Sequence, residues 1–310
     1  MAYVWQLTVV ELNVSVLVTG TILKHKTRID RKPSSIFANA WDVLTSYQNQ
    51  AYKQQEIIIK TPNDRFLITT TTQGYFNDLL PLQSCSRLQI FDKEHHILQI
   101  DQVHPYYFKD SGADVEVISD IDDTVILSHT ASVLKRIFTI LFRRPKRRKK
   151  VLFSHALLDF FAQNNFRIAY LSKSESNLFG LITSIFRYND IPEGPLFLSP
   201  YLKFKSLLKP QKGNHKLTFL HQLISNSPGK KFILIGDDTQ KDMALYSDIV
   251  KHYSSQIIKV YIRQAGFFVD DSQKKQWQAL QDSGVDSMYF EDDADIESEL
   301  KALKQNLNLT

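Results

Sequence analysis

The chain has 310 residues, 43% of them hydrophobic and only ten each glycine and proline, which excludes a disordered protein and favours two globular domains. Its 38 basic and 33 acidic residues give a modest formal net charge of +5. Cys85 is the single cysteine, which excludes an intrachain disulfide and fits a reducing compartment. There is no run of 18 apolar residues and no basic leader, so we expect a cytoplasmic protein without a spanning helix or signal peptide.

Residues 1–114 are predicted to form a small β-rich module. Segment 13–23, NVSVLVTGTIL, alternates like a strand with one buried face. Segment 55–76 is typical of two strands joined by a Pro-Asn-Asp turn and followed by a Gln-Gly turn. Between them, segment 34–55 carries apolar residues at helical spacing. The module is therefore expected to be sandwich-like with one helical excursion.

Residues 115–310 follow a different pattern, in which short apolar runs alternate with helical segments. The predicted strands are Val115–Ser119, Ile168–Ser172, Pro195–Ser199, Lys231–Gly236, Ile257–Ile262 and Ser287–Phe290. The predicted helices cover 155–164, 175–188, 215–226, 243–254 and a closing stretch within 291–305. This alternation predicts an α/β domain with a parallel sheet and helices on both faces, and burial of both faces explains why the strands are continuously apolar.

Three aspartates, Asp120, Asp122 and Asp123, follow the first strand of this second region. In open parallel sheets, ligands bind beyond the carboxyl ends of the strands. Carboxylates this close together repel one another, and a bound divalent cation removes that penalty. Because the ligands are hard oxygens, the spacing favours Mg²⁺.

Several readings of this cluster stay open from the triplet alone. It fits a solvated acidic turn, or the D-x-D by which nucleotide-sugar transferases hold a metal. An EF-hand loop is excluded, because Val125 and Ala131 stand where that loop needs glycine and glutamate. A phosphoaspartyl enzyme with Asp120 as nucleophile also fits, and it makes demands further along the chain.

Later segments meet those demands in order. Asp122 lies two residues after the nucleophile position, where an acid/base is needed. Ser172 ends the second strand and offers a hydroxyl, and Lys216 begins a helix and offers a cation for phosphoryl oxygens. Asp237 ends another strand, Asp242 lies five residues on, and both can complete a metal shell. A set in this order is far more specific than any one of its members.

These segments together resemble the haloacid dehalogenase superfamily of phosphotransferases. More narrowly, they resemble the catalytic domain of the actin-patch-associated phosphatidate phosphatases and their bacterial relatives. The resemblance covers about residues 115–300 and is carried by GADVEVISDIDDTV, IAYLSKSESNLF, IPEGPLFLS, NHKLTFLHQL and GKKFILIGDDTQKDMALYSDIV. It implies a haloacid-dehalogenase-like Rossmannoid domain over 115–310. VTGTIL and TTTTQGYF in the front half resemble the β-rich module of bacterial members, which implies such a module over 1–114.

The resemblance implies catalytic roles for single residues. Asp120 would attack phosphorus and bind Mg²⁺ through its other oxygen. Asp122 would act as general acid and then base, and offer its backbone carbonyl to the metal. Thr124 would steady the loop by hydrogen bonding, while Ser172 and Lys216 would bind the phosphoryl oxygens.

The resemblance also implies that Asp237 binds the metal and that Asp242 supports it, whereas it assigns no separate step to Asp123. Two departures lie beside the expected pocket. Residues 173–175 read Lys-Ser-Glu where many relatives have Asn-Ser-Pro, and position 238 is Asp where they often have a small hydroxyl residue. We expect Lys173, and Arg263 at the end of a later strand, to contact substrate.

Segment 134–150, LKRIFTILFRRPKRRKK, is the most basic stretch of the chain. An apolar face flanked by cations suits an anionic membrane surface, so Lys135, Arg136, Arg143 and Arg144 are candidate membrane contacts. The alternatives are a solvated loop with a short helix, a nuclear localisation signal, or nucleic-acid binding. We do not expect nucleic acid as a partner, because the run lacks interleaved aromatics for base stacking.

The resemblance makes phosphatidate the expected substrate, hydrolysed with Mg²⁺ through an aspartyl-phosphate to diacylglycerol and phosphate. A phosphatase for another anionic phosphomonoester is the second hypothesis. The third is a membrane-binding or scaffolding protein with an idle site, although an idle site has no physical need to keep the full set of acidic, hydroxyl and lysine side chains. We expect a cytoplasmic protein with peripheral membrane contact.

Overall fold

A computed structural model of the chain describes residues 2–25, 41, 44–85, 87–127, 150–202, 215–238, 242–265, 269–291 and 293–309. Of the helix predicted over 34–55, the structure describes residue 41, which is helical, and 44–55, of which only 44–46 are helical. Residues 47–55 form turns and an isolated bridge between Ala51 and Leu23, so the predicted helix is wrong over that part. Segment 134–150 lies outside the described residues except for Lys150. Within the described part, no helix is long and apolar enough to cross a bilayer.

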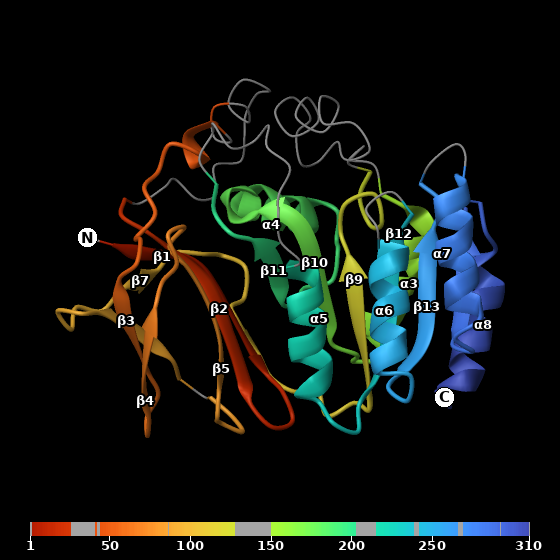
Figure 1. Cartoon of the computed structure of the whole chain (residues 1–310), viewed down its shortest axis with the longest axis horizontal. Coiled ribbons are helices and arrows are strands. Elements are labelled where there is room, and N and C mark those ends of the chain that lie inside the picture. Colours follow the sequence, from red (N-terminus) through yellow and green to blue (C-terminus); the bar gives the residue numbers. More distant parts are fainter. Residues whose placement is uncertain are drawn as a thin grey trace.

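The second half of the chain is built on a six-stranded parallel sheet (Figure 1). Its strand order is β11-β10-β9-β12-β13-β14, so the chain starts in the middle, winds outward to one edge and then returns to wind outward to the other. The strands are β9 (Val115–Asp120), β10 (Ile168–Glu175), β11 (Leu196–Ser199), β12 (Lys231–Asp237), β13 (Ile257–Arg263) and β14 (Asp286–Phe290). All six predicted strands and the parallel arrangement are confirmed.

Helices cover both faces of this sheet, as the continuous apolar runs predicted. They are α3 (Leu152–Gln163), α4 (Phe179–Tyr188), α5 (His215–Ser225), α6 (Asp242–His252), α7 (Asp271–Gln281) and α8 (Ile296–Asn306). Successive residues of β9 point to opposite layers: Val117 joins the core under α3, α4 and α8, and Ile118 joins the core under α5, α6 and α7.

One boundary was predicted wrongly. The segment from Glu175 was expected to be helical, but β10 continues to Glu175 and is followed by the 3₁₀ turn Ser176–Leu178 before α4 begins. The reason is long-range pairing, because Glu175 lies opposite Ser199 of β11 after an irregularity in the ladder that follows Leu171.

The first part of the chain forms two smaller sheets. One contains β1 (Tyr3–Glu11), β2 (Val16–Leu23), β5 (Tyr75–Leu80), β7 (Gln99–Ile100) and β8 (Tyr107–Phe108); the other contains β3 (Glu56–Lys60), β4 (Arg65–Thr69) and β6 (Gln89–Asp92). The predicted β3–β4 hairpin is confirmed. The turn before β5 places Gly74 at a φ of +69°, which favours glycine. The division at residue 114 stays a prediction.

Strand β2 departs from its expected pattern, because both of its faces are buried. Val16 and Val18 pack in the core of the β-rich region, whereas Leu17 between them packs in a core that it shares with α5 and α6. The sequence alternation of β2 therefore marked two apolar environments and not one apolar and one solvated face.

Strand β1 covers the edge of the parallel sheet. Gln6 Nε2 and Thr8 Oγ1 both donate to the carbonyl of Leu196 in β11, at 3.2 and 3.0 Å. Trp5 Nε1 donates to the Ser176 carbonyl at 2.7 Å, beyond the end of β10. These contacts satisfy carbonyl groups that an uncovered edge would present to other chains.

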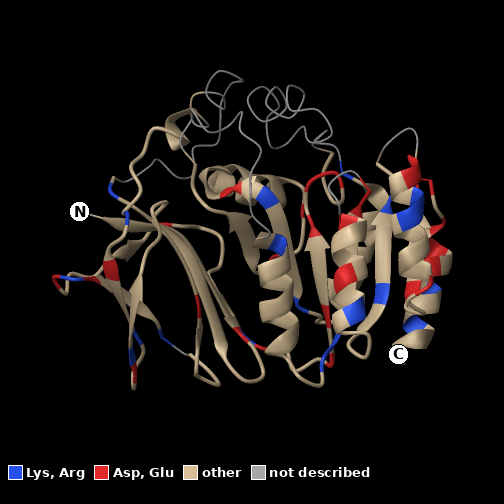
Figure 2. Cartoon of the chain, viewed as in Figure 1, with Lys and Arg blue, Asp and Glu red and all other residues tan. Residues whose placement is uncertain are grey.

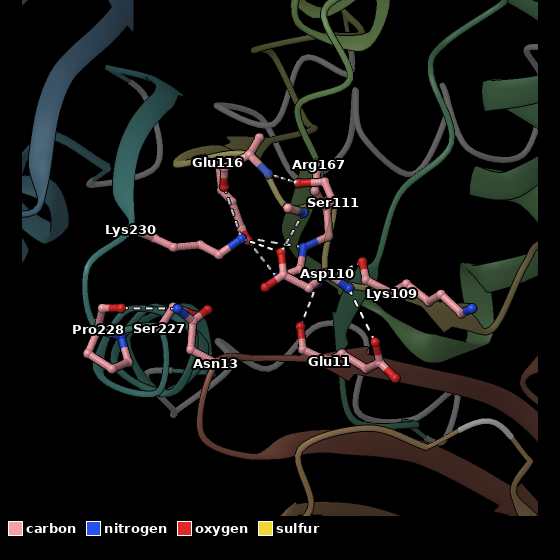
Figure 3. Close-up of polar contacts among 12 residues, drawn as sticks. Glu11, Asn13, Lys109, Asp110, Ser111, Glu116, Arg167, Ser227, Pro228 and Lys230 are labelled. Atoms are coloured by element: carbon pink, nitrogen blue, oxygen red, sulfur yellow. Dashed lines mark hydrogen bonds and ion pairs between the residues drawn. The ribbon is translucent and has the colours of Figure 1, made fainter.

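A charged network ties the two parts together at the opposite, amino-terminal edge of the sheet (Figure 3). Arg167, just before β10, donates through Nη2 and Nε to Glu116 at 2.7 and 3.2 Å, and through Nη1 to the carbonyls of Glu11 and Lys109 at 2.6 and 3.1 Å. Lys230 approaches Glu116 at 3.0 Å. Arg167 and Glu116 are buried, so the network depends on complete pairing.

Replacing Arg167 by methionine is therefore expected to lower the free energy of unfolding by about 3 kcal/mol, because the buried Glu116 carboxylate loses two of its hydrogen bonds and keeps only Lys230, and two carbonyls lose their donor. Urea denaturation followed by far-UV circular dichroism measures this. Lys274→Met is the control, since its ion pair with Asp271 is exposed at 3.3 Å and should be worth less than about 1 kcal/mol. Equal effects of the two substitutions would contradict the prediction.

Candidate active site

The predicted site residues come together where the strand order of the parallel sheet reverses, between β9 and β12. Asp120 is the last residue of β9 and Asp237 the last of β12. The two strands are neighbours and parallel, so their carboxyl ends lie side by side, at the upper side of Figure 1. This is the position at which open α/β sheets bind ligands. Acidic residues gather there in Figure 2, at the ends of β9 and β12 and the start of α6.

Three buried carboxylates meet at this point. Asp120, Asp237 and Asp242 each place an oxygen within 4.8 Å of the other two, and none of the three is exposed. Lys216, in the first turn of α5, lies between them: its Nζ donates to Asp120 Oδ1 at 2.5 Å and to the two oxygens of Asp242 at 2.9 and 3.0 Å. The lysine thus bridges the proposed nucleophile and the helix α6.

The electrostatic balance of the cluster is uneven, because one lysine faces three carboxylates. Burial raises the pKa of Asp120 well above its usual value; the Lys216 ammonium opposes this, and the other carboxylates add to it. Burial alone would lower the pKa of Lys216, but Asp120 and Asp242 outweigh burial and raise it. The ammonium group of Lys216 therefore stays charged, but one positive charge does not balance the carboxyl groups of Asp120, Asp237 and Asp242.

Those three carboxylates fit a hard divalent cation. They supply buried oxygen donors from β9, β12 and α6 within one ligand's reach of each other, and their mutual repulsion is what a cation relieves. A second acidic group, Asp92, Glu94 and His96 in the β-rich region, is a weaker candidate. Its glutamate and histidine are exposed, and Asp92 already accepts the backbone N–H groups of Glu94 and His96 as a turn cap.

Close approach of α6 to β12 depends on a glycine. A Cβ at Gly236 would lie 2.7 Å from Tyr246 Cε2 and 3.0 Å from Asp242 Cβ. The contact with Tyr246 is shorter than real Cβ atoms show and the contact with Asp242 is tighter than most, while Tyr246 is fixed by donating to the Ile235 carbonyl at 2.9 Å. Glycine before Asp237 is therefore what lets Asp242 enter the cluster.

The loop after β9 is locked from two sides. Thr124 Oγ1 lies 3.1 Å from Asp120 Oδ2 and 3.4 Å from Asp237 Oδ2, so its hydroxyl can steady either carboxylate. Asp123 has a φ of +61°, which is the left-handed region that aspartate tolerates better than most residues. Its carbonyl accepts a hydrogen bond from Arg263 Nη1 at 2.6 Å.

Two residues expected beside the pocket differ in their surroundings. Arg263 is buried and donates to the Asp123 carbonyl, so the contact that the structure shows is with the loop after β9. Lys173 is exposed on β10 near the cluster. Desolvation lowers the pKa of Lys173, against the pull of Asp242, and the Lys216 charge lowers it further. Substrate contact by either residue stays a prediction.

Asp238 has a structural explanation that the sequence did not reveal. Its carboxylate accepts from the Ala265 N–H at 2.9 Å and from the Tyr289 hydroxyl at 2.6 Å. Gln273 of α7 donates to its carbonyl at 2.9 Å. The carboxylate at this position thus joins the end of β12 to β14 and to the segment after β13, while the backbone carbonyl of the same residue contacts α7.

The acid/base candidate Asp122 is held by two serines. Ser172 Oγ and Ser174 Oγ lie 2.8 and 2.9 Å from the same oxygen, Asp122 Oδ2. Sequence reasoning found Asp122 and Ser172 but not Ser174. The signal was present, because residues two apart in a strand point to the same side.

The four membrane-contact candidates, Lys135, Arg136, Arg143 and Arg144, lie outside the described residues.

The region that contains this cluster is similar in sequence to known proteins. Residues 115–264 match the family model described as the catalytic domain of phosphatidate phosphatase APP1. Phosphatidate phosphatase APP1 of Saccharomyces cerevisiae is 28% identical over 180 residues, which cover 55% of this chain and 29% of that protein. An uncharacterized protein of Schizosaccharomyces pombe is 21% identical over 215 residues, covering 64% of this chain and 34% of its own. The chain thus spans about a third of the length of these curated relatives.

Solved structures give no closer guide. A carbohydrate acetylesterase from Xanthomonas citri matches with a TM-score of 0.31 and 8% identity, over 91% of this chain and 66% of that one. The PilB minor pilin of Streptococcus sanguinis matches with a TM-score of 0.32 and 10% identity, over 83% and 87%. Both TM-scores are too low to indicate a shared fold. The sequence matches support the similarity of residues 115–264 to the catalytic domains of APP1-type phosphatidate phosphatases.

Proposed function

We propose that the chain is a phosphomonoester hydrolase with a haloacid-dehalogenase-like catalytic domain, and that it releases phosphate from phosphatidate with the help of Mg²⁺. The single observation that carries the proposal is the buried contact of Asp120 with Lys216 at the strand-order reversal, beside Asp237 and Asp242. The match of residues 115–264 to a phosphatidate phosphatase catalytic domain supports both the reaction class and the substrate.

In this proposal Asp120 is the nucleophile. One of its carboxylate oxygens attacks phosphorus as the bond from phosphorus to the alcohol oxygen breaks, which gives an aspartyl-phosphate. Asp122 gives its proton to the leaving alkoxide, and then takes a proton from the water that attacks phosphorus in the second step. That step releases inorganic phosphate and restores the free Asp120 carboxylate.

The other residues hold charge in place during the transfer. Lys216 is already at hydrogen-bonding distance from Asp120 and would bind the equatorial phosphoryl oxygens, with Ser172 as a second donor. Asp120, Asp237 and Asp242 fit Mg²⁺, with the Asp122 carbonyl as a further ligand. When bound, the cation would screen the repulsion between the nucleophile and an anionic phosphate.

Access to a lipid substrate is assigned to segment 134–150, which follows the catalytic loop in sequence. Its cations, including Lys135, Arg136, Arg143 and Arg144, would hold the protein peripherally on an anionic leaflet. The proposed protein is thus a cytoplasmic enzyme that binds the membrane surface peripherally.

Phosphate release tests the reaction and the substrate. Wild-type protein with Mg²⁺ should release phosphate from phosphatidate in vesicles, and Asp120→Asn should reduce the rate at least about 10³-fold because the nucleophile is lost. Asp92→Asn is the matched control, an identical change in the acidic group of the β-rich region, and should keep the wild-type rate. Release only from a soluble phosphomonoester would overturn phosphatidate as substrate, and unchanged release by Asp120→Asn would overturn the mechanism.

Thermal unfolding tests the metal site. At a Mg²⁺ concentration about 100 times its dissociation constant, the folded state should gain about 2.7 kcal/mol, which corresponds to a rise in Tm of several degrees. Asp237→Asn should raise the Tm in chelator, since one of three like charges is removed, and should abolish most of the Mg²⁺-induced rise. Asp92→Asn should keep that rise; its loss there would assign the metal to the β-rich region.

The pH dependence of the same measurement has a definite sign. The pKa of Asp120 is raised in the folded protein, so protonation stabilises the metal-free fold, and this contribution is lost as pH rises through the raised pKa. Protons and Mg²⁺ relieve the same repulsion. The Mg²⁺-induced rise in Tm should therefore be larger at pH 8 than near pH 5, and a larger rise at the lower pH would contradict this account.

A further inference from the structure

Ser174 has no role in the proposed reaction, yet it contacts the acid/base directly. Its Oγ donates to Asp122 Oδ2 at 2.9 Å, and its backbone N–H donates to Ser172 Oγ at 2.9 Å. Both serines are 3% exposed. Ser172, Ser174 and Asp122 thus form a closed triangle of hydrogen bonds at the carboxyl end of β10.

The two serines must have different roles, because each hydroxyl can donate only one hydrogen bond. A hydroxyl has one O–H group to donate. In the structure Ser172 is placed to give its proton to Asp122 at 2.8 Å, but the proposed function requires it to give that proton to a phosphoryl oxygen. When substrate is bound, Ser174 is the one of these two hydroxyl donors that is left for Asp122 Oδ2.

Fixing Oδ2 matters because of how an aspartate side chain moves. The torsion between Cβ and the carboxylate is broad, so an unsupported carboxylate turns over a wide range. A general acid must bring its proton within about 2.6–3.2 Å of the leaving oxygen. A hydrogen bond that anchors one carboxylate oxygen therefore sets where the other can reach.

Ser174 is itself held in place by the β-rich region. It lies in the irregular part of β10 between Leu171 and Glu175. Two residues later, the Ser176 carbonyl accepts from Trp5 Nε1 at 2.7 Å, and the Ser176 and Thr21 hydroxyls lie 3.2 Å apart. Strands β1 and β2 thus fix the segment that carries Ser174, although they contribute no side chain to the carboxylate cluster.

We propose that Ser174 is a positioning residue that aims Asp122 at the leaving oxygen while Ser172 binds phosphate. This inference rests on the proposed function, because it assumes that Asp122 protonates the leaving group. It predicts that Ser174 matters in proportion to how much the leaving group needs a proton. An alkoxide needs one, whereas a nitrophenolate is a weak base and departs without one.

The test compares two soluble esters in the full-length protein with Mg²⁺: glycerol 3-phosphate and p-nitrophenyl phosphate. Ser174→Ala should lower kcat/KM for the alkyl ester on the order of 10²-fold, and for the aryl ester by less than about fivefold. Ser174→Thr, which keeps the hydroxyl, should return the ratio of the two rates toward the wild-type value. Ser174→Cys has nearly the shape of serine and a weak donor, so it should give an intermediate ratio and serves if the alanine variant fails to fold.

Ser154→Ala is the matched control. Ser154 is fully buried in α3, and among the described residues its hydroxyl has no hydrogen-bond partner. Ser154→Ala should leave the ratio of kcat/KM for the two esters at its wild-type value. If replacing Ser174 only loosened the fold, the Ser174 variants would also keep that ratio.

The outcomes separate the inference from the function on which it rests. Equal losses on both esters in the Ser174 variants would overturn the positioning role while leaving the phosphatase intact. Absence of Mg²⁺-dependent release by the wild-type protein from both esters and from phosphatidate in vesicles would overturn the proposed function, and the role of Ser174 with it. A selective loss on the alkyl ester that threonine reverses would establish the role.

Discussion

Three carboxylates buried within 4.8 Å of one another, with a single lysine among them, are the constraint on which the rest of the structure depends. Without a bound cation such a cluster is unfavourable, because burial and the repulsion of the neighbouring carboxylates both disfavour the ionised form of Asp120. The reversal of strand order brings Asp120 and Asp237 to one crevice, and Gly236 lets α6 bring Asp242 to the same place. The surrounding fold therefore has to be stable enough to hold charges that would otherwise separate.

Much of that stability comes from regions far from the crevice. The buried network of Glu116, Arg167 and Lys230 lies at the amino-terminal ends of β9, β10 and β12 and joins them to the end of β1. Near the crevice, Trp5 and the side chains of β1 hold β11 and the turn after β10. The β-rich region thus supports the β11 edge of the parallel sheet and the amino-terminal ends of its central strands. The two parts share cores as well as contacts, so their stabilities are expected to be linked.

The sequence was sufficient for those features that local chemistry determines. Strands buried on both faces are continuously apolar, so all six strands of the parallel sheet were predicted. The ends of those strands pointed to Asp120, Ser172 and Asp237, and the start of a helix pointed to Lys216. What it did not predict depends on contacts between distant segments. The extension of β10 to Glu175 follows from its pairing with Ser199, and the burial of Asp238 follows from Tyr289 and Ala265. The second buried face of β2 likewise required knowledge of where α5 and α6 pack.

The loop after β9, residues 121–124, combines an unusual backbone conformation with a hydrogen bond from a distant strand. Asp123 adopts a left-handed conformation directly between Asp122 and Thr124, and the buried Arg263 from β13 donates to its carbonyl. A residue in that conformation reverses the chain sharply, so that Asp122 can face Ser172 and Ser174 while Thr124 turns back toward Asp120 and Asp237. The acidic run after β9 is therefore not one cluster of charge. Its first member belongs to the carboxylate site, its second to the serines of β10, and its third supplies the turn that separates them.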